Sequence, residues 1–193
     1  MFSNKDLRKL IIPLVIEQLL AVTIGMADTV MVSSCGEAAV SGISLVDSIN
    51  FLLITLFSSL ATGGAVIASQ YIGRGDHKSA SLAAKQLFYA SLALSAVLGV
   101  IAVFFRKPVL NMVFGSIEAD VMAHAQIYFL LSAISYPFLA VYNAGAALFR
   151  SMGDSRTTML ISILMNTINI VGNAILIYGF QMAAAGAATA SLV

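Results

Sequence analysis

Long apolar runs separated by short polar stretches dominate this chain. Five runs reach the roughly 20 residues that a helix needs to cross a bilayer, and a sixth stops at Val193 after about half that length. The predicted helices cover residues 10–33, 44–72, 83–105, 122–149, 159–180 and the incomplete 182–193. This pattern predicts an all-α polytopic membrane protein, with one transmembrane lobe over residues 1–193 whose sixth helix is truncated.

The composition agrees with lipid as the solvent of this chain. Hydrophobic residues make up 60% and charged residues 10%, whereas soluble domains carry roughly a quarter charged residues. A net charge of +1 gives no indication of a nucleic-acid partner. The zinc-protease, nucleophile-elbow and phosphate-loop motifs do not occur in the sequence. We therefore expect neither an enzyme nor an ATP-driven pump, and no cofactor beyond a coupling ion.

The distribution of basic residues predicts the orientation, because cytoplasmic loops collect Lys and Arg. Eight of the ten fall before the first predicted helix, between the second and third, or between the fourth and fifth: Lys5, Arg8, Lys9, Arg74, Lys78, Lys85, Arg150 and Arg156. The opposite loops hold only Arg106 and Lys107. We expect a multi-pass protein of the plasma membrane with a cytoplasmic N-terminus, and no buried Lys or Arg inside the helices.

Two acids interrupt the first apolar run. Glu17 and Asp28 are eleven residues apart, which places them about 20° apart on one face of a helix. An ionised carboxylate at mid-bilayer costs about 2.5 to 3.5 kcal/mol, so such residues are functional by default. Asp28 is too deep for its short side chain to reach water easily. Glu17 is longer, lies closer to the inner surface, and is equally consistent with a cavity or with a side chain that reaches the interface.

The fifth predicted helix carries a polar stripe with the spacing of one helix face, formed by Ser162, Asn166, Asn169 and Asn173. Such amides either hold helices together or line a cavity. Asn173 and Thr189, in the incomplete sixth helix, are predicted at the depth of Asp28. Carboxylate, amide and hydroxyl oxygens at one level suit a proton or a small cation such as Na⁺, for which Asp28 would be the charged ligand.

Other polar and aromatic residues are weaker candidates for a cavity. Asp47 and Asn50 are predicted to open the second helix at the outer surface, where Asp47 is interpreted as a solvated acid at a helix start. Tyr136 and Tyr142 are aromatic residues that either line a pocket for organic cations or pack against other helices. Two inner loops, "GRGDHKSA" and "SMGDSR", place Gly-Asp among basic residues, which predicts a tight turn followed by a capped helix start.

Several motifs taken together resemble the multidrug and toxic compound extrusion family. They are "MADTVMV" (Met26–Val32), "ASQYIGRGD" (Ala68–Asp76), "LFRSMGDSRTTM" (Leu148–Met159), and "NIVGNAILIYG" followed by "GAATA". The resemblance runs in order over nearly the whole chain. It implies a twelve-helix exporter of two six-helix lobes, driven by H⁺ or Na⁺, of which this chain matches the N-terminal lobe and lacks the C-terminal one.

The resemblance also implies roles for individual residues. Asp28 matches the cation-coupling acid of the first helix, Asn169 and Asn173 match a polar pair on the fifth, and Thr189 matches a hydroxyl on the sixth. Some family members carry Asp at the position of Asn173. Thr158 stands where the family often has Pro, a change that we expect to matter little. Small organic cations, the lipid bilayer and the missing lobe are the implied partners.

Two other functions remain open on the sequence. A lipid-linked precursor flippase of the same broad superfamily would need a cationic cavity for diphosphate, which the predicted helices lack. A non-transporting scaffold or truncated remnant is consistent with the chain length. The substrate, the choice between H⁺ and Na⁺, and the oligomeric state do not follow from the sequence.

The orientation can be tested by cysteine labelling. A cysteine at Lys78 or Ser155 is expected to react with a membrane-impermeant maleimide only from the cytoplasmic side, because both positions lie in loops on the basic side. Native Cys35 is expected to react from outside. Labelling of position 78 from outside would contradict the predicted orientation.

Overall fold

Five helices form the part of the chain that a computed structural model describes, residues 4–33 and 36–175. They are α1 (Asn4–Ser33), α2 (Glu37–Gly73), α3 (His77–Phe114), α4 (Ala119–Ser151) and α5 (Ser155–Asn173). These residues contain no strand. The side chains of residues 4–6, 27 and 28 lie outside this description, as do the predicted sixth helix and Thr189.

The prediction of an all-α membrane protein is confirmed, and the helices extend beyond the predicted apolar runs. Four of them, α1 to α4, are long and apolar enough to cross a membrane. They are longer than predicted because the apolar criterion marks only the part of a helix that lipid must surround. Over its described residues α5 does not meet that criterion, since polar residues replace apolar ones along one of its faces.

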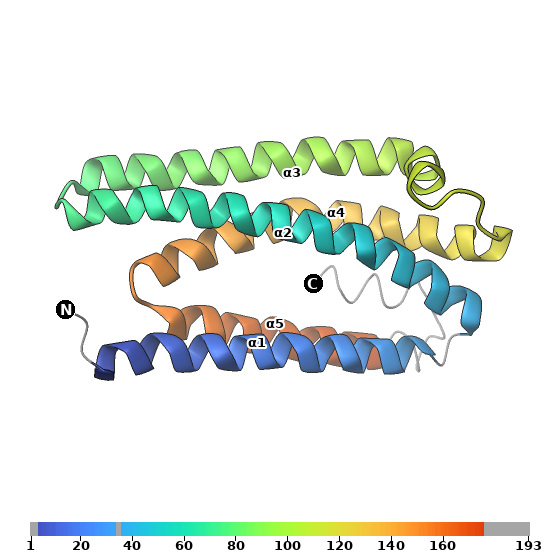
Figure 1. The fold of residues 1–193 in the computed structure, drawn as a ribbon, viewed down its shortest axis with the longest axis horizontal. Coiled ribbons are helices and arrows are strands. Elements are labelled where there is room, and N and C mark those ends of the chain that lie inside the picture. Colours follow the sequence, from blue (N-terminus) through green and yellow to red (C-terminus); the bar gives the residue numbers. More distant parts are fainter. Residues whose placement is uncertain (1–3, 34–35, 176–193) are drawn as a thin grey trace.

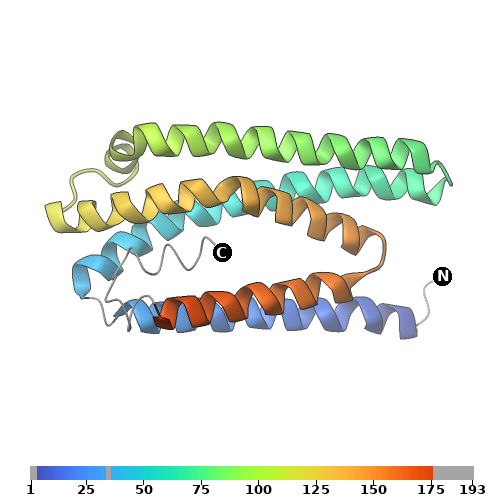
Figure 2. The same cartoon turned by 180° about the vertical axis from the view of Figure 1, so that it is seen from behind.

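The helices pack as two units. One is the three-helix layer formed by α2, α3 and α4, and the other is the α1–α5 pair, whose two helices lie side by side and run in the same direction (Figures 1 and 2). Packing is extensive within each unit and sparse between α1 and α2 and between α4 and α5. Among the described residues, the interactions that connect the two units are therefore few.

Aromatic residues fill the core of the three-helix layer. Phe57, Phe129 and Tyr136 are almost fully buried, and the rings of Phe57 and Tyr136 are 6.2 Å apart. Glycine permits close contact between α2 and α4: a Cβ atom at Gly42 would lie 2.8 Å from the carbonyl oxygen of Val121. Small residues of this kind let membrane helices approach closely and gain van der Waals contact.

The two Gly-Asp loops adopt the turns that the sequence predicts. Gly75 and Gly153 have positive φ angles of 75° and 86°. Asp76 then accepts a hydrogen bond from the Ser79 N–H at 3.0 Å, and Asp154 accepts one from the Thr157 N–H at 3.1 Å. These hydrogen bonds lower the pKa of both carboxyl groups, so the two caps stay ionised at neutral pH.

Burial makes one of the two positions proposed for labelling unsuitable. Ser155 is buried at the start of α5, so a cysteine there would react poorly from either side. Met152 lies in the same loop and is exposed, which makes it the better position.

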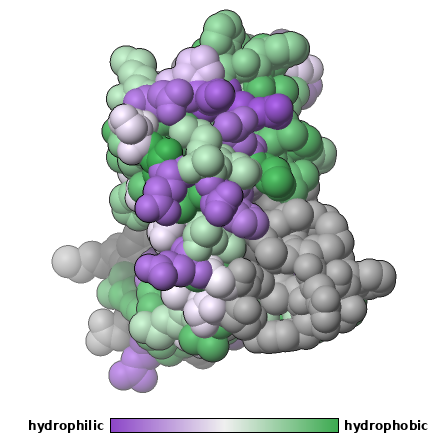
Figure 3. All heavy atoms as spheres, turned by 90° about the vertical axis from the view of Figure 1, so that its right-hand side faces the viewer, coloured by the Kyte–Doolittle hydropathy of each residue, from purple (hydrophilic) through white to green (hydrophobic). Residues whose placement is uncertain are grey.

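The end of the molecule opposite the start of α1 contains a kink in α3 (Figure 1). Phe105 has non-helical angles (φ −111°, ψ 21°), three residues before Pro108, whose ring removes a backbone donor and clashes with the preceding turn. The predicted third segment ends at this kink, although the helix continues to Phe114. Hydrophilic residues gather across this end, with hydrophobic residues beside them (Figure 3). This distribution is typical of the point where a helical bundle leaves lipid for water.

Close packing at Gly42 leads to a test of the fold. Gly42→Ala is expected to lower the free energy of unfolding by about 1–3 kcal/mol, because the added methyl group would meet the backbone of α4. Gly63 is the matched control on the same helix, since nothing lies within 4 Å of a Cβ atom there. Thermal unfolding of the detergent-solubilised variants measures the difference, and equal midpoints would contradict the close approach of α2 and α4.

Candidate functional site

The buried face of α5 is polar. Its buried residues are Ser155, Thr158, Ser162 and Asn173. Its exposed side chains include Leu160, Leu164 and Val171. Lipid solvates apolar side chains as well as a protein interior does, whereas polar groups must find partners inside. The polar face of α5 therefore points into the protein. Thr158, which precedes the predicted helix 159–180, belongs to this face.

Hydrogen bonds run along this face between residues one helical turn apart. Asn166 Nδ2 donates to Ser162 Oγ at 3.2 Å, and Asn173 Nδ2 donates to Asn169 Oδ1 at 3.2 Å. Asn173 is fully buried, whereas Asn166 is half-buried. The polar groups of the predicted stripe thus form two hydrogen-bonded pairs, one between an amide and a hydroxyl and one between two amides.

The backbone places Asp28 near the same end of the α1–α5 pair as Asn173. Asp28 lies between one and two turns before Ser33, the last residue of α1, and Asn173 is the last residue of α5. The two helices run in the same direction side by side (Figure 1). The side chain of Asp28 and the whole of Thr189 lie outside the described residues. The cation-coupling set of Asp28, Asn169, Asn173 and Thr189 therefore stays a prediction.

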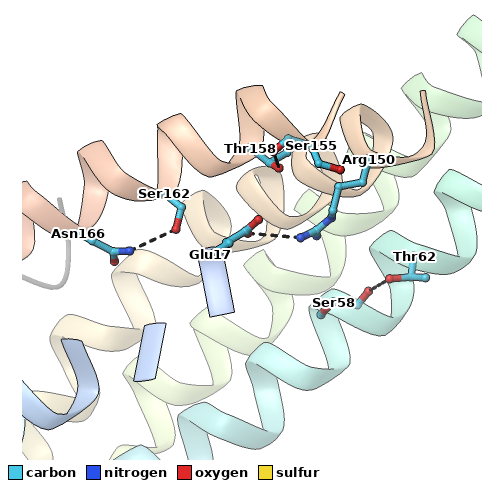
Figure 4. Close-up of polar contacts among 8 residues, drawn as sticks. All are labelled: Glu17, Ser58, Thr62, Arg150, Ser155, Thr158, Ser162 and Asn166. Carbon is cyan, nitrogen blue, oxygen red and sulfur yellow. Dashed lines mark hydrogen bonds and ion pairs between the residues drawn. The ribbon is translucent and has the colours of Figure 1, made fainter. Parts of the chain in front are cut away.

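Glu17 forms an ion pair with Arg150, 3.3 Å from Oε1 to Nη1 (Figure 4). The sequence placed Arg150 in a loop, which is wrong, and Arg150 is the half-buried basic residue of this site. Arg150 belongs to the last turn of α4, and its side chain is only 30% exposed. The opposite charge of Glu17 is the physical reason that the guanidinium is stable in this half-buried position.

Polar groups from three helices gather around this ion pair. Tyr142 on α4 lies beside Ser162 and within electrostatic range of Glu17. The second oxygen of Glu17, Oε2, is buried and has no hydrogen-bond partner among the described residues. A cavity of about 150 Å³ lies between α4 and α5, lined by Tyr142, Gly145, Ala146, Phe149, Thr158 and Ile161. The structure thus brings together Glu17, Tyr142 and the Ser162–Asn166 part of the stripe.

The remaining predicted cavity residues lie within the three-helix layer. The Tyr136 hydroxyl donates to Asn50 Oδ1 at 2.8 Å, and Asn50 Nδ2 donates to Ser132 Oγ at 3.2 Å. These contacts fasten α2 to α4. Asp47 does not open α2, because the helix begins ten residues earlier at Glu37. It accepts a hydrogen bond from the Tyr128 hydroxyl at 2.9 Å, which adds a second polar link between the same two helices.

A polar groove escaped the sequence analysis. It has a volume of about 560 Å³ and lies between α1, α2 and α4. Its lining consists of Gln18, Ile54, Thr55, Ser58, Ser59, Thr62 and Asn143. The spacing of Thr55, Ser59 and Thr62 at i, i+4 and i+7 is the signal that could have indicated it. Lipid does not favour such a surface, so the groove indicates water, a ligand or further protein on this side.

A bundle of apolar helices with a polar inward face and a polar groove is typical of membrane transport proteins. The family model described as MatE matches residues 13–175, and the chain therefore belongs to the MatE family, a family of multidrug efflux transporters. The predicted resemblance is confirmed.

Individual relatives agree with this assignment. The chain is 30% identical over 168 residues to an uncharacterized transporter, YisQ, of Bacillus subtilis, covering 86% of this chain and 36% of YisQ. It is 29% identical over 199 residues to a probable multidrug resistance protein NorM of Thermotoga maritima, covering 98% of this chain and 41% of NorM. The chain thus spans about two fifths of the length of these relatives.

Solved structures give the same result. A MOP superfamily transporter from Pyrococcus furiosus superposes with a TM-score of 0.84 at 27% identity, covering 97% of this chain and 41% of that one. A multidrug resistance MATE family transporter in an outward-facing conformation superposes with a TM-score of 0.84 at 26% identity, again covering 97% of this chain and 41% of that one. In each case the match is confined to part of the larger protein.

The ion pair can be tested by a double-mutant cycle. Glu17→Gln and Arg150→Gln are each expected to destabilise the protein, with a coupling energy of about 1–3 kcal/mol, because either change leaves the other charge half-buried without its partner. Lys85→Gln, an exposed residue of α3, is the control for the loss of one charge. Unfolding in detergent measures the coupling, and additive effects would contradict the pairing.

Proposed function

We propose that this chain forms the N-terminal lobe of an antiporter that exports organic cations in exchange for H⁺ or Na⁺. The observation that carries the proposal is the polar buried face of α5 beside α1, the helix that contains Asp28. Single polar residues can hold membrane helices together, but a whole buried polar face exceeds what such packing needs. A row of hydroxyl and amide groups next to the helix that carries Asp28 suits reversible binding of a small cation.

The chemistry of this region favours an ion that enters as substrate leaves. Asp28 supplies the negative charge, and Asn169, Asn173 and Thr189 supply neutral oxygen atoms. Oxygen ligands of this kind bind Na⁺, while the carboxylate alone can take up a proton. Binding of either ion removes the net charge of the site and thereby changes the relative free energies of its conformations.

The polar groove along α2 is the proposed path for substrate. Its hydroxyl and amide groups are neutral and lie on the surface of the lobe. Two lobes that rock around a shared central site are the common arrangement of secondary transporters. We infer that the missing C-terminal lobe covers this groove, that the protein resides in the plasma membrane, and that its N-terminus is cytoplasmic.

The alternative of a lipid-linked precursor flippase has less support. Such a protein needs free cations inside a cavity between its helices to hold a diphosphate. Arg150 is half-buried in its helix, but the charge of Glu17 already neutralises it. The alternative of a non-transporting scaffold or remnant is separated from the proposal by the transport assay below.

Asp28→Asn is expected to abolish efflux in a full-length transporter that carries this sequence. The change preserves the size and hydrogen bonding of the side chain, but it removes the anion that holds H⁺ or Na⁺, so the gradient can no longer drive release. Efflux of a cationic dye from energised membrane vesicles measures the effect. Asn173→Ala is expected to weaken the dependence on the cation less severely, because an amide orients the site without carrying its charge.

The control is Asp120→Asn, which removes an exposed acid in the first turn of α4. It is expected to leave efflux unchanged. If Asp28→Asn transported at the parental rate, with the same response to pH and to Na⁺, the coupling role would be wrong. An inactive parental protein with normal expression would favour the scaffold.

A further inference from the structure

A groove between α1 and α5 at the predicted cytoplasmic end combines basic and apolar walls. It has a volume of about 800 Å³ and is lined by Arg8, Lys9, Ile12, Pro13, Ile16, Arg156, Met159 and Leu160. The three basic residues lie at the start of the two helices, and the apolar residues follow within the next two turns. The groove is therefore basic at the predicted membrane surface and apolar where it extends into the membrane.

The electrostatics of the basic end favour an anion. Besides the three side-chain charges, the N-termini of α1 and α5 meet here, because the two helices run in the same direction (Figure 1). Each N-terminus adds the positive end of a helix dipole. Two acids adjoin these residues in the sequence: Asp6, which is adjacent to Lys5, and Asp154, which caps α5 through Thr157. The basic end therefore has an excess of positive charge.

The apolar part of the groove has the exposure expected of a surface in contact with lipid chains. Ile12 is 54% exposed and Leu160 61% exposed. A soluble anion would gain nothing from this wall, whereas an amphiphile would bury its chain against it. Basic pockets between transmembrane helices on the cytoplasmic side bind the head groups of anionic lipids. Charge and apolar surface thus select the same kind of ligand.

We propose that this groove binds an anionic phospholipid of the cytoplasmic leaflet. Arg8, Lys9 and Arg156 hold its phosphate-containing head group, and an acyl chain lies along Ile12, Ile16 and Leu160. The site is separate from the polar face of α5 and from the groove along α2. A lipid held here contacts both helices of the α1–α5 pair, so anionic lipid in the leaflet stabilises the packing of α1 against α5.

The absence of tryptophan from the sequence permits a direct test. Leu160→Trp places a single fluorophore in the groove, and Leu82→Trp places one at the matched depth, five residues after the start of α3, at a position that is 57% exposed. Each variant is reconstituted in nanodiscs that contain brominated phosphatidylglycerol or brominated phosphatidylcholine at the same mole fraction. Bromine quenches tryptophan on contact, so the ratio of the two signals reports which lipid occupies the position.

In the Leu160→Trp variant, phosphatidylglycerol is expected to quench the fluorescence at least about fivefold more effectively at low mole fraction, the enrichment that a single basic residue near a charged leaflet provides. The Leu82→Trp variant is expected to show little preference. Combining Arg8→Gln, Lys9→Gln and Arg156→Gln should remove the preference at position 160. The combination of Arg74→Gln, Lys78→Gln and Lys85→Gln, which removes three charges from the same end of the molecule, in the α2–α3 loop and on α3, should leave it intact.

Two results would overturn the proposal. Equal quenching by both lipids in the Leu160→Trp variant would mean that the groove contacts bulk lipid without selecting its head group. Weak quenching by both would mean that protein, not lipid, covers the groove. The measurement needs no transport activity, so it is independent of the function proposed above. Circular dichroism of each variant confirms that the helices are retained.

Discussion

The absence of water from the hydrocarbon core is the constraint on which this structure depends. Every polar group in that region must find a partner within the protein. Hydroxyl groups on α2 use the backbone of their own helix, as when Thr55 donates to the Phe51 carbonyl at 2.7 Å. Amide groups on α5 pair with residues one turn away, and the longer Glu17 and Arg150 side chains reach across helices. The length of a polar side chain therefore decides whether its partner lies on the same helix or on a neighbouring one.

The same constraint divides the lobe into two units with different chemistry. Aromatic rings and close glycine contacts hold the three-helix layer together, and its polar links, such as Tyr136 to Asn50, are internal to α2 and α4. The α1–α5 pair contains the polar buried face. Sparse packing between the units leaves the Glu17–Arg150 ion pair as a prominent connection among the described residues. A closely packed three-helix layer beside a more loosely attached polar pair is an arrangement that permits relative motion.

Three regions of the lobe differ in their charge. Neutral hydroxyl and amide groups line the groove along α2, the Glu17–Arg150 ion pair joins α1 to α4, and an excess of basic side chains gathers at the basic end of the α1–α5 pair. Uncompensated charge is tolerated only where the head groups and water of the interface can solvate it. The basic end therefore suits recognition of lipid head groups, whereas the interior suits ions and substrates that are released again.

The amino-acid sequence by itself determined the helical membrane fold, the family and the turns at Gly75 and Gly153, because apolar run length and local backbone preference are properties of neighbouring residues. It also indicated the stripe from Ser162 to Asn173, which follows from helix periodicity. The sequence could not pair Glu17 with Arg150 or Asp47 with Tyr128, since those contacts join residues 133 and 81 positions apart. Only the tertiary structure decided them, because helix order along the chain does not specify which helices are neighbours or which faces they share.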